Sequence, residues 1–110
     1  MRTRNRFEEF LNELNNGKTF EEICKEHNNT MVECIENEVY EDEDLYEFLN
    51  ELGASIYYYG IGYVIVMTDD EKTYKIPCEE RENRFDDDLP NETILFFDSS
   101  KIYDVTENFR

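Results

Sequence analysis

The spacing of the hydrophobic residues changes near the middle of the chain, and this change constrains the fold more than any other feature. In the first half, apolar residues such as Phe7, Phe10 and Leu14 recur at the intervals of one helix face. In the second half, residues 55–67 are rich in Tyr, Ile and Val, which favour strands. The sequence therefore predicts an α+β fold, with an N-terminal helical layer packed on a small, mainly antiparallel sheet.

Three to four short helices are expected in residues 1–53, and capping residues mark their ends. Thr19 and Thr30 each stand three residues before a glutamate, which is the pattern of a capping box and predicts a helix start. The acidic residues from Asp42 onward favour another start, because carboxylates in a first turn complement the helix dipole. Gly17 and Gly53 are typical of helix ends.

About four strands are expected in residues 54–110. Gly60 and Gly62 indicate a bend within the first strand-forming stretch, and a polar connection is expected over residues 77–91. No repeat or flexible linker separates the two halves, so one domain is predicted over residues 1–110. The expected strand segments are residues 55–67, 72–76, 93–97 and 101–105.

The charge of the chain is strongly negative. Its 28 acidic and 11 basic residues give a formal net charge of −17, and three of the bases are Arg2, Arg4 and Arg6. Hydrophobic residues make up 39% of the chain and aromatic residues 15%, which is typical of a protein that folds and not of an acidic disordered tail. Direct binding of nucleic acid or an anionic membrane is disfavoured, and a basic protein partner is expected.

The cysteine count and the apolar runs indicate a cytoplasmic protein. There are three cysteines and no apolar leader segment at the start, which argues against a secreted disulfide scaffold. The longest apolar run, Ile61 to Met67, is far shorter than the roughly 20 residues of a membrane-spanning helix.

Two arrangements could carry chemistry, and each has a plainer explanation. Cys24 and His27 are three residues apart and could form a nucleophile–base pair on one helix face. With Cys34 and Cys78 they could also supply four zinc ligands, although the second pair is not local. The alternative is that Cys24 is a small core residue and His27 a cation at a helix end. No cofactor is expected, and the chain is predicted not to be an enzyme.

Residues 19–39 have the pattern of a helix-turn-helix unit, with two short predicted helices separated by a turn at Asn28 and Asn29. In the DNA-binding form of this unit the second helix enters the major groove. Here that helix would present Glu33, Glu36 and Glu38, which phosphates would repel. The segment is therefore expected to be a packing unit that does not read DNA.

Residues 33–51 contain nine carboxylates and no Lys or Arg. If this stretch were mostly helical it would span about 27 Å, with a charge about every 3 Å. One DNA strand carries a phosphate about every 3.4 Å along the duplex, so the two linear charge densities are similar. The nine carboxylates are Glu33, Glu36, Glu38, Glu41, Asp42, Glu43, Asp44, Glu47 and Glu51.

A second acidic run and a group of tyrosines complete the expected partner-binding surface. Asp86, Asp87 and Asp88 lie within the long polar connection. Residues 57–59 are three adjacent tyrosines, of which one or two are expected to be exposed because side chains alternate along a strand. We expect Tyr58 to act as an aromatic anchor for the partner.

In its small size, extreme acidity, abundant Asn, Glu, Tyr and Phe, and lack of a catalytic motif, the chain resembles inhibitors encoded by phages and mobile elements. These include anti-CRISPR proteins and antirestriction DNA mimics. The resemblance implies an inhibitor that blocks the DNA-binding site of a CRISPR effector or restriction enzyme with carboxylates in place of phosphates. It would act as a monomer or homodimer. The alternative is an acidic, non-catalytic adaptor or regulatory protein whose charge serves solubility.

Overall fold

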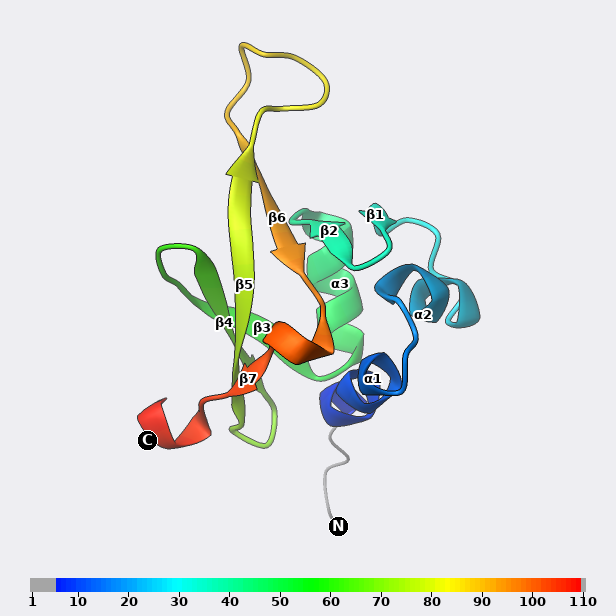
Figure 1. Ribbon diagram of the computed structural model, residues 1–110, viewed down its shortest axis with the longest axis vertical. Helices are drawn as coiled ribbons and strands as arrows, with labels where there is room; N and C mark the ends of the chain where they lie inside the picture. The colour runs from blue at the N-terminus through cyan, green and yellow to red at the C-terminus, as the bar shows by residue number, and fades with distance from the viewer. Residues whose placement is uncertain (1–5, 110) are drawn as a thin grey trace.

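The structure, a computed structural model that describes residues 6–109, is an α+β fold, as the sequence predicts (Figure 1). Three α-helices occupy the first half of the chain and most of the strands lie in the second. The helices are α1 (Arg6–Asn15), α2 (Phe20–Glu26) and α3 (Glu43–Glu51). The strands are β1 (Cys34–Ile35), β2 (Glu38–Tyr40), β3 (Ala54–Tyr59), β4 (Tyr63–Thr68), β5 (Thr73–Arg81), β6 (Glu92–Phe96) and β7 (Tyr103–Asp104), with short 3₁₀ helices η1 (Ser99–Lys101) and η2 (Thr106–Phe109).

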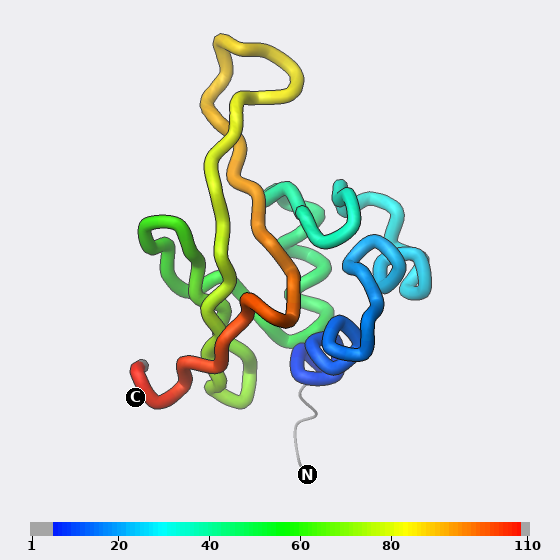
Figure 2. The backbone as a smooth tube through the Cα atoms, in the orientation of Figure 1, coloured from blue at the N-terminus to red at the C-terminus, as the bar shows by residue number. Residues whose placement is uncertain are grey.

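The sheet has seven strands where about four were expected, and all of its pairings are antiparallel. Its order is β1-β2-β6-β5-β4-β3, with β7 also paired to β5. The long strand β5 has β4 along one edge, whereas β6 and then β7 share the other (Figure 2). Beyond the helices, β5 and β6 continue as a two-stranded ribbon that projects from the body of the protein (Figure 1).

The prediction of a helix beginning at Thr30 is wrong, because β1 and β2 form a hairpin there. Its turn contains Glu36 at a φ of 56°. Contacts from distant segments hold this turn: the Asn37 side chain accepts a hydrogen bond from the Phe20 amide (2.9 Å), and the Asn37 carbonyl accepts one from the Phe97 amide (2.8 Å). The segment from Thr19 is therefore a helix followed by a hairpin and not a helix-turn-helix unit.

Three of the expected strands differ: residues 55–67, expected as one strand-forming stretch with a bend, form the two paired strands β3 and β4, and two further strands have different limits. Strand β5 continues to Arg81, through the expected polar connection, and Pro77 lies where β5 passes from pairing with β4 to pairing with β6. A proline is tolerated there because it need not donate a ladder hydrogen bond. The last strand is reduced to β7, because η1, which Asp98 caps, includes Lys101 and η2 begins directly after Val105, so only Tyr103 and Asp104 pair with β5.

The core joins the helices to the sheet through an aromatic cluster. The apolar stripes expected on the helices are buried, and Phe10 lies at the centre with ring centroids 5.6–5.8 Å from Phe7, Phe20, Phe48 and Phe97. This packing fixes which face of each helix points to solvent. None of the helices within residues 6–109 is long and apolar enough to cross a membrane. Arg2 and Arg4 lie outside the described residues.

Candidate partner-binding surface

The basic side chains are distributed unevenly over the three helices. Lysines neutralise part of the charge of α1 and of α2, whereas no carboxylate of α3 has an ion pair with a residue in the described range 6–109. The helix that keeps its charge is therefore α3. The lysine pairs on α1 and α2 are Lys72–Glu8 (3.2 Å), Lys18–Glu13 (3.7 Å), Lys18–Glu26 (2.8 Å) and Lys25–Glu21 (3.7 Å).

The charged face of α3 consists of Glu43, Asp44, Glu47 and Glu51, which we call the α3 stripe. The opposite face of the helix is buried in the core, so Glu43, Glu47 and Glu51 are exposed, whereas Asp44 is half-buried. Asp44, Glu47 and Glu51 line a shallow hollow together with residues 27–31. Glu43, Glu47 and Glu51 follow each other at intervals of one turn, or about 6 Å along the axis. Glu51 lies in the last turn, at the negative end of the helix dipole; α3 has no base of its own there, although the Arg6 guanidinium donates to the Glu51 main-chain carbonyl (3.0 Å). Glu43 and Asp44 complement the dipole in the first turn, whereas Glu47 and Glu51 do not stabilise the helix in this way.

A hydrogen-bonded cluster joins the start of α3 to strand β3. Glu41 Oε1 accepts hydrogen bonds from the hydroxyls of Tyr46 and Tyr59, both at 2.5 Å, and the two hydroxyl oxygens lie 3.3 Å apart. Burial, and then the hydrogen bond to the Glu41 carboxylate, raise the pKa of both tyrosines above the usual 10. Next to this cluster, Asp42 caps α3 by accepting from the Leu45 amide (3.0 Å), and burial raises the pKa of its carboxyl.

Replacing Glu41 with glutamine is expected to lower the pKa of Tyr46 and Tyr59 toward the usual value, because the phenolates no longer form beside a carboxylate. A raised tyrosine pKa stabilises the fold below pH about 10, and this contribution is lost as pH rises through the folded-state pKa. The ultraviolet absorbance of tyrosinate during an alkaline titration measures the change. Glu36→Gln is the control, and superimposable curves for Glu41→Gln and wild type would show that the cluster is not formed.

The hairpin of β3 and β4 is uncharged, and although β4 is mostly buried, the end of β3 and the β3–β4 turn are exposed. Residues 52–68 contain no acidic or basic residue, in a chain of which 35% is charged. The β3–β4 register shifts between Ile56 and Tyr58, so Tyr57 is a bulge residue. All three tyrosines are exposed as a result, by 59% at Tyr57, 49% at Tyr58 and 55% at Tyr59, where one or two were expected. Tyr59 connects this neutral surface to Glu41 and to Tyr46 of α3.

Other parts of the expected acidic surface are neutralised by two arginines from the distant β5 segment. Arg81 pairs with Glu38, and Arg84 pairs with Glu33. Arg84 also bonds the Glu92 carboxylate (3.1 Å), and its guanidinium lies 3.6 Å from the centroid of the Tyr40 ring. The stretch that lacks bases in the sequence is therefore partly neutralised in space. Glu36 lies in the β1–β2 turn, separate from the α3 stripe.

Asp86, Asp87 and Asp88 are exposed at the far end of the β5–β6 ribbon (Figure 1). The loop is held by its own polar groups: Asn83 Oδ1 accepts from the Phe85 amide (2.9 Å), and Asp86 Oδ1 accepts from the Asp88 amide (2.9 Å). The ribbon carries these carboxylates away from α3 (Figure 2). The two acidic runs of the sequence thus form two separate surfaces.

The cysteines and the histidine do not assemble into a reactive site. Cys24 is buried beside Cys34, and burial raises the pKa of its thiol to about 12, which keeps it protonated at neutral pH. The His27 ring instead lies edge-on to Phe48, with ring centroids 6.4 Å apart. Within residues 6–109 no group of three or more His, Cys, Asp or Glu side chains is placed to hold a metal ion.

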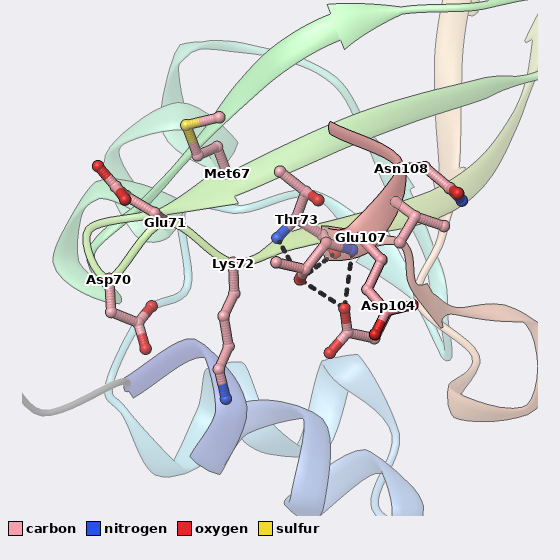
Figure 3. A pocket seen from close by; sticks show the side chains of 10 residues that line it. Met67, Asp70, Glu71, Lys72, Thr73, Asp104, Glu107 and Asn108 are labelled. Atoms are coloured by element: carbon pink, nitrogen blue, oxygen red, sulfur yellow. Dashed lines mark hydrogen bonds between the residues drawn. The ribbon is translucent and has the colours of Figure 1, made fainter. Parts of the chain in front are cut away.

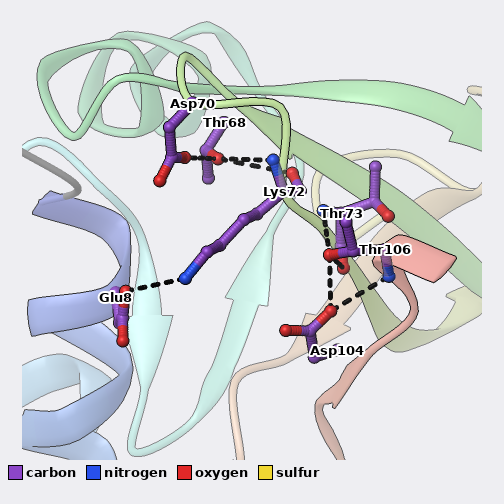
Figure 4. A network of polar contacts seen from close by, with 7 residues as sticks. All are labelled: Glu8, Thr68, Asp70, Lys72, Thr73, Asp104 and Thr106. Atoms are coloured by element: carbon purple, nitrogen blue, oxygen red, sulfur yellow. Dashed lines mark hydrogen bonds and ion pairs between the residues drawn. The ribbon is translucent and has the colours of Figure 1, made fainter. Parts of the chain in front are cut away.

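A hollow of about 800 Å³ lies between the β4–β5 turn and the C-terminal segment (Figure 3). Its polar walls bond to one another and to α1 (Figure 4): Lys72 reaches Glu8, the Thr73 amide donates to Thr106 Oγ1 (3.1 Å), and the Thr106 hydroxyl donates to Asp104 (2.5 Å). These hydrogen bonds from Thr106 lower the pKa of Asp104. The Thr73 hydroxyl is buried without a hydrogen-bond partner. We interpret the contacts along its walls as structural, because they attach the C-terminal segment to β5, and β5 to α1.

Comparison with known proteins found no matching family model, no matching curated protein and no matching solved structure. What the surface can do therefore follows from its own residues. It combines the α3 stripe, the Glu41 cluster and the uncharged tyrosine hairpin on neighbouring elements. Carboxylates without cations and exposed tyrosines suit binding to a basic protein surface.

Proposed function

We propose that this protein is a non-catalytic inhibitor that occupies the DNA-binding site of a nucleic-acid-processing enzyme, such as a CRISPR effector or a restriction nuclease. The observation that supports this function is the α3 stripe, whose four carboxylates have no ion pair within residues 6–109. The protein would work in the cytoplasm, without a cofactor. Its partner is a basic protein and not a nucleic acid, because the net charge of −17 repels phosphates.

The spacing of the stripe fits the proposal. Carboxylates one helical turn apart are separated by about 6 Å along the axis. Every second phosphate of a DNA strand is separated by about 6.8 Å along the duplex. Arg and Lys side chains that are placed to hold alternate phosphates can therefore pair with Glu43, Glu47 and Glu51 after only small shifts in their positions. The neighbouring tyrosines Tyr57 and Tyr58 would add contact area at the edge of the site.

The uncharged hairpin favours a second function, that of an acidic adaptor. Residues 52–68 expose Tyr57, Tyr58, Tyr59 and Ile61 without any charged residue. Large exposed apolar side chains that are grouped in this way are typical of protein–protein contacts. In an adaptor the hairpin would bind the partner, and the charge of α3 would only keep the protein soluble.

Displacement of DNA distinguishes the two functions. Fluorescent duplex DNA is bound to each member of a panel of CRISPR effectors and restriction nucleases, and the protein is titrated in at several salt concentrations. An inhibitor that mimics DNA is expected to release the DNA from at least one enzyme. The logarithm of its affinity for that enzyme should fall linearly with the logarithm of the salt concentration. Polyglutamate at equal carboxylate concentration is the control and should release much less. Binding to a nuclease that is insensitive to salt and leaves the DNA bound would favour the adaptor.

A further inference from the structure

The hollow between the β4–β5 turn and the C-terminal segment is lined by more acid than its own contacts neutralise. Its one lysine, Lys72, is already paired with Glu8 of α1 (3.2 Å) (Figure 4). The carboxylates of Glu71 and Glu107 have no hydrogen bond or ion pair with any residue in the range 6–109. The hollow therefore attracts cations. The four carboxylates that line it are Asp70, Glu71, Asp104 and Glu107.

These carboxylates lie at two ends of the hollow. Figure 3 shows Asp70 and Glu71 at one end, on the β4–β5 turn, and Asp104 and Glu107 at the other, on β7 and η2. Both hydrogen bonds that Asp104 receives from Thr106 go to Oδ1, so Oδ2 stays available for a ligand. This arrangement suits an extended ligand with a cationic group at each end. A metal ion fits less well, because within residues 6–109 no three His, Cys, Asp or Glu side chains are close enough together to hold one.

Between the two acidic ends lies a buried hydroxyl group without a hydrogen-bond partner. Thr73 is 1% exposed, and its Oγ1 has no partner within residues 6–109. Thr73 is paired with Met67 across β4 and β5, so the two side chains lie on the same face of the sheet, where both line the hollow (Figure 3). A buried polar group without a partner is rare and costly, and a bound amine can donate to it. The hydroxyl therefore indicates a ligand with a donor between its charged ends.

We propose that the hollow binds a linear polyamine such as spermidine. Its terminal ammonium groups pair with the carboxylates at the two ends, its inner amine donates to Thr73 Oγ1, and a methylene segment lies against Met67. A volume of about 800 Å³ is in the range of small-molecule sites. The bound ligand joins the β4–β5 turn to the C-terminal segment. This site is separate from the α3 stripe, so it adds a ligand that the proposed function does not require.

Isothermal titration calorimetry with spermidine at physiological salt tests the site, and Thr73→Val is the decisive variant because it removes the acceptor and leaves the net charge at −17. We expect one spermidine to bind the wild type and Thr73→Val to bind it about tenfold more weakly. Thr73→Ser keeps the hydroxyl and should stay within about threefold of the wild type. The hydroxyl has no partner in the free protein, so Thr73→Val should not lower the urea midpoint of unfolding. Putrescine lacks the inner amine, so Thr73→Val should change its affinity less than about twofold.

Variants of matched charge test the two acidic ends. Glu71→Gln/Glu107→Gln removes one carboxylate from each end and should weaken spermidine binding about three- to thirtyfold. The control Asp86→Asn/Asp87→Asn removes the same charge from the ribbon loop and should change affinity less than about twofold. Trilysine with an acetylated N-terminus and an amidated C-terminus carries the same charge as spermidine, and it should bind more weakly because its ammonium groups are attached to a bulky main chain.

Equal spermidine affinities of the wild type and Thr73→Val would overturn the inference, because the net charge alone would then explain binding. Equal losses in the two double variants would overturn it for the same reason. Tighter binding of trilysine than of spermidine would assign the hollow to lysine side chains of a partner protein and not to a polyamine. These titrations contain no nuclease, so their outcome is independent of that of DNA displacement.

Discussion

Replacing Phe10 with alanine is expected to lower the free energy of unfolding by about 3–5 kcal/mol. The Phe10 ring is 2% exposed and packs on four other phenylalanines, with centroid distances of 5.6–5.8 Å. Truncation removes the apolar area of the ring and leaves a cavity that is bordered by α1, α2, α3 and the end of β6. A domain of this size has a total stability of about 5–15 kcal/mol, so the variant would be close to unfolding.

Urea denaturation followed by circular dichroism measures this loss. The matched control is Phe85→Ala, because Phe85 is 73% exposed on the loop of the β5–β6 ribbon and its removal should change stability by less than about 0.5 kcal/mol. A loss below about 1 kcal/mol for Phe10→Ala would mean that the helices do not meet the sheet as described. If the variant expresses only as aggregate, Phe10→Leu keeps most of the volume and should lie between the two.

The elements that could be predicted from the sequence are those whose signals are local. Thr19 caps α2 by accepting from the Glu22 amide (3.1 Å), and Asp42 caps α3, as the capping patterns indicate. The pattern at Thr30 has the same form, yet a hairpin forms there. The difference is that Asn37 bonds to Phe20 and Phe97, and Val39 is fully buried, so contacts from other elements outweigh the local preference.

The same distinction applies to the candidate surface. The α3 stripe could be predicted because its residues are close in the sequence and lie on one helix face. The pairing of Glu38 with Arg81 could not, since the two are 43 positions apart and are brought together by the pairing of β2, β6 and β5. Nor could the exposure of all three tyrosines be predicted, because it depends on where β3 is bulged.

Reversing Glu43, Asp44 and Glu47 to lysine is expected to reduce affinity for the basic partner about a hundredfold or more. Each reversal replaces an attraction with a repulsion, and about 1 kcal/mol at each of three sites gives about two orders of magnitude. The matched control reverses Asp86, Asp87 and Asp88, which changes the net charge equally, from −17 to −11 because each reversal adds two charges. This control should change affinity only through the long-range field, by about threefold, and less at high salt. DNA displacement by the two variants measures both effects.

Stability separates the loss of binding from a loss of folding. Glu43 and Asp44 lie in the first turn of α3, so their reversal should cost about 0.3–1 kcal/mol each. Glu51 lies in the last turn, where the dipole favours a cation, but the Arg6 guanidinium already donates to the Glu51 carbonyl (3.0 Å), so Glu51→Lys should change stability little while it weakens binding about fivefold. A change that leaves stability unaltered and weakens binding identifies a charge that acts on the partner. If instead the loop variant lost displacement and the α3 variant kept it, the binding surface would be the ribbon loop and not the α3 stripe.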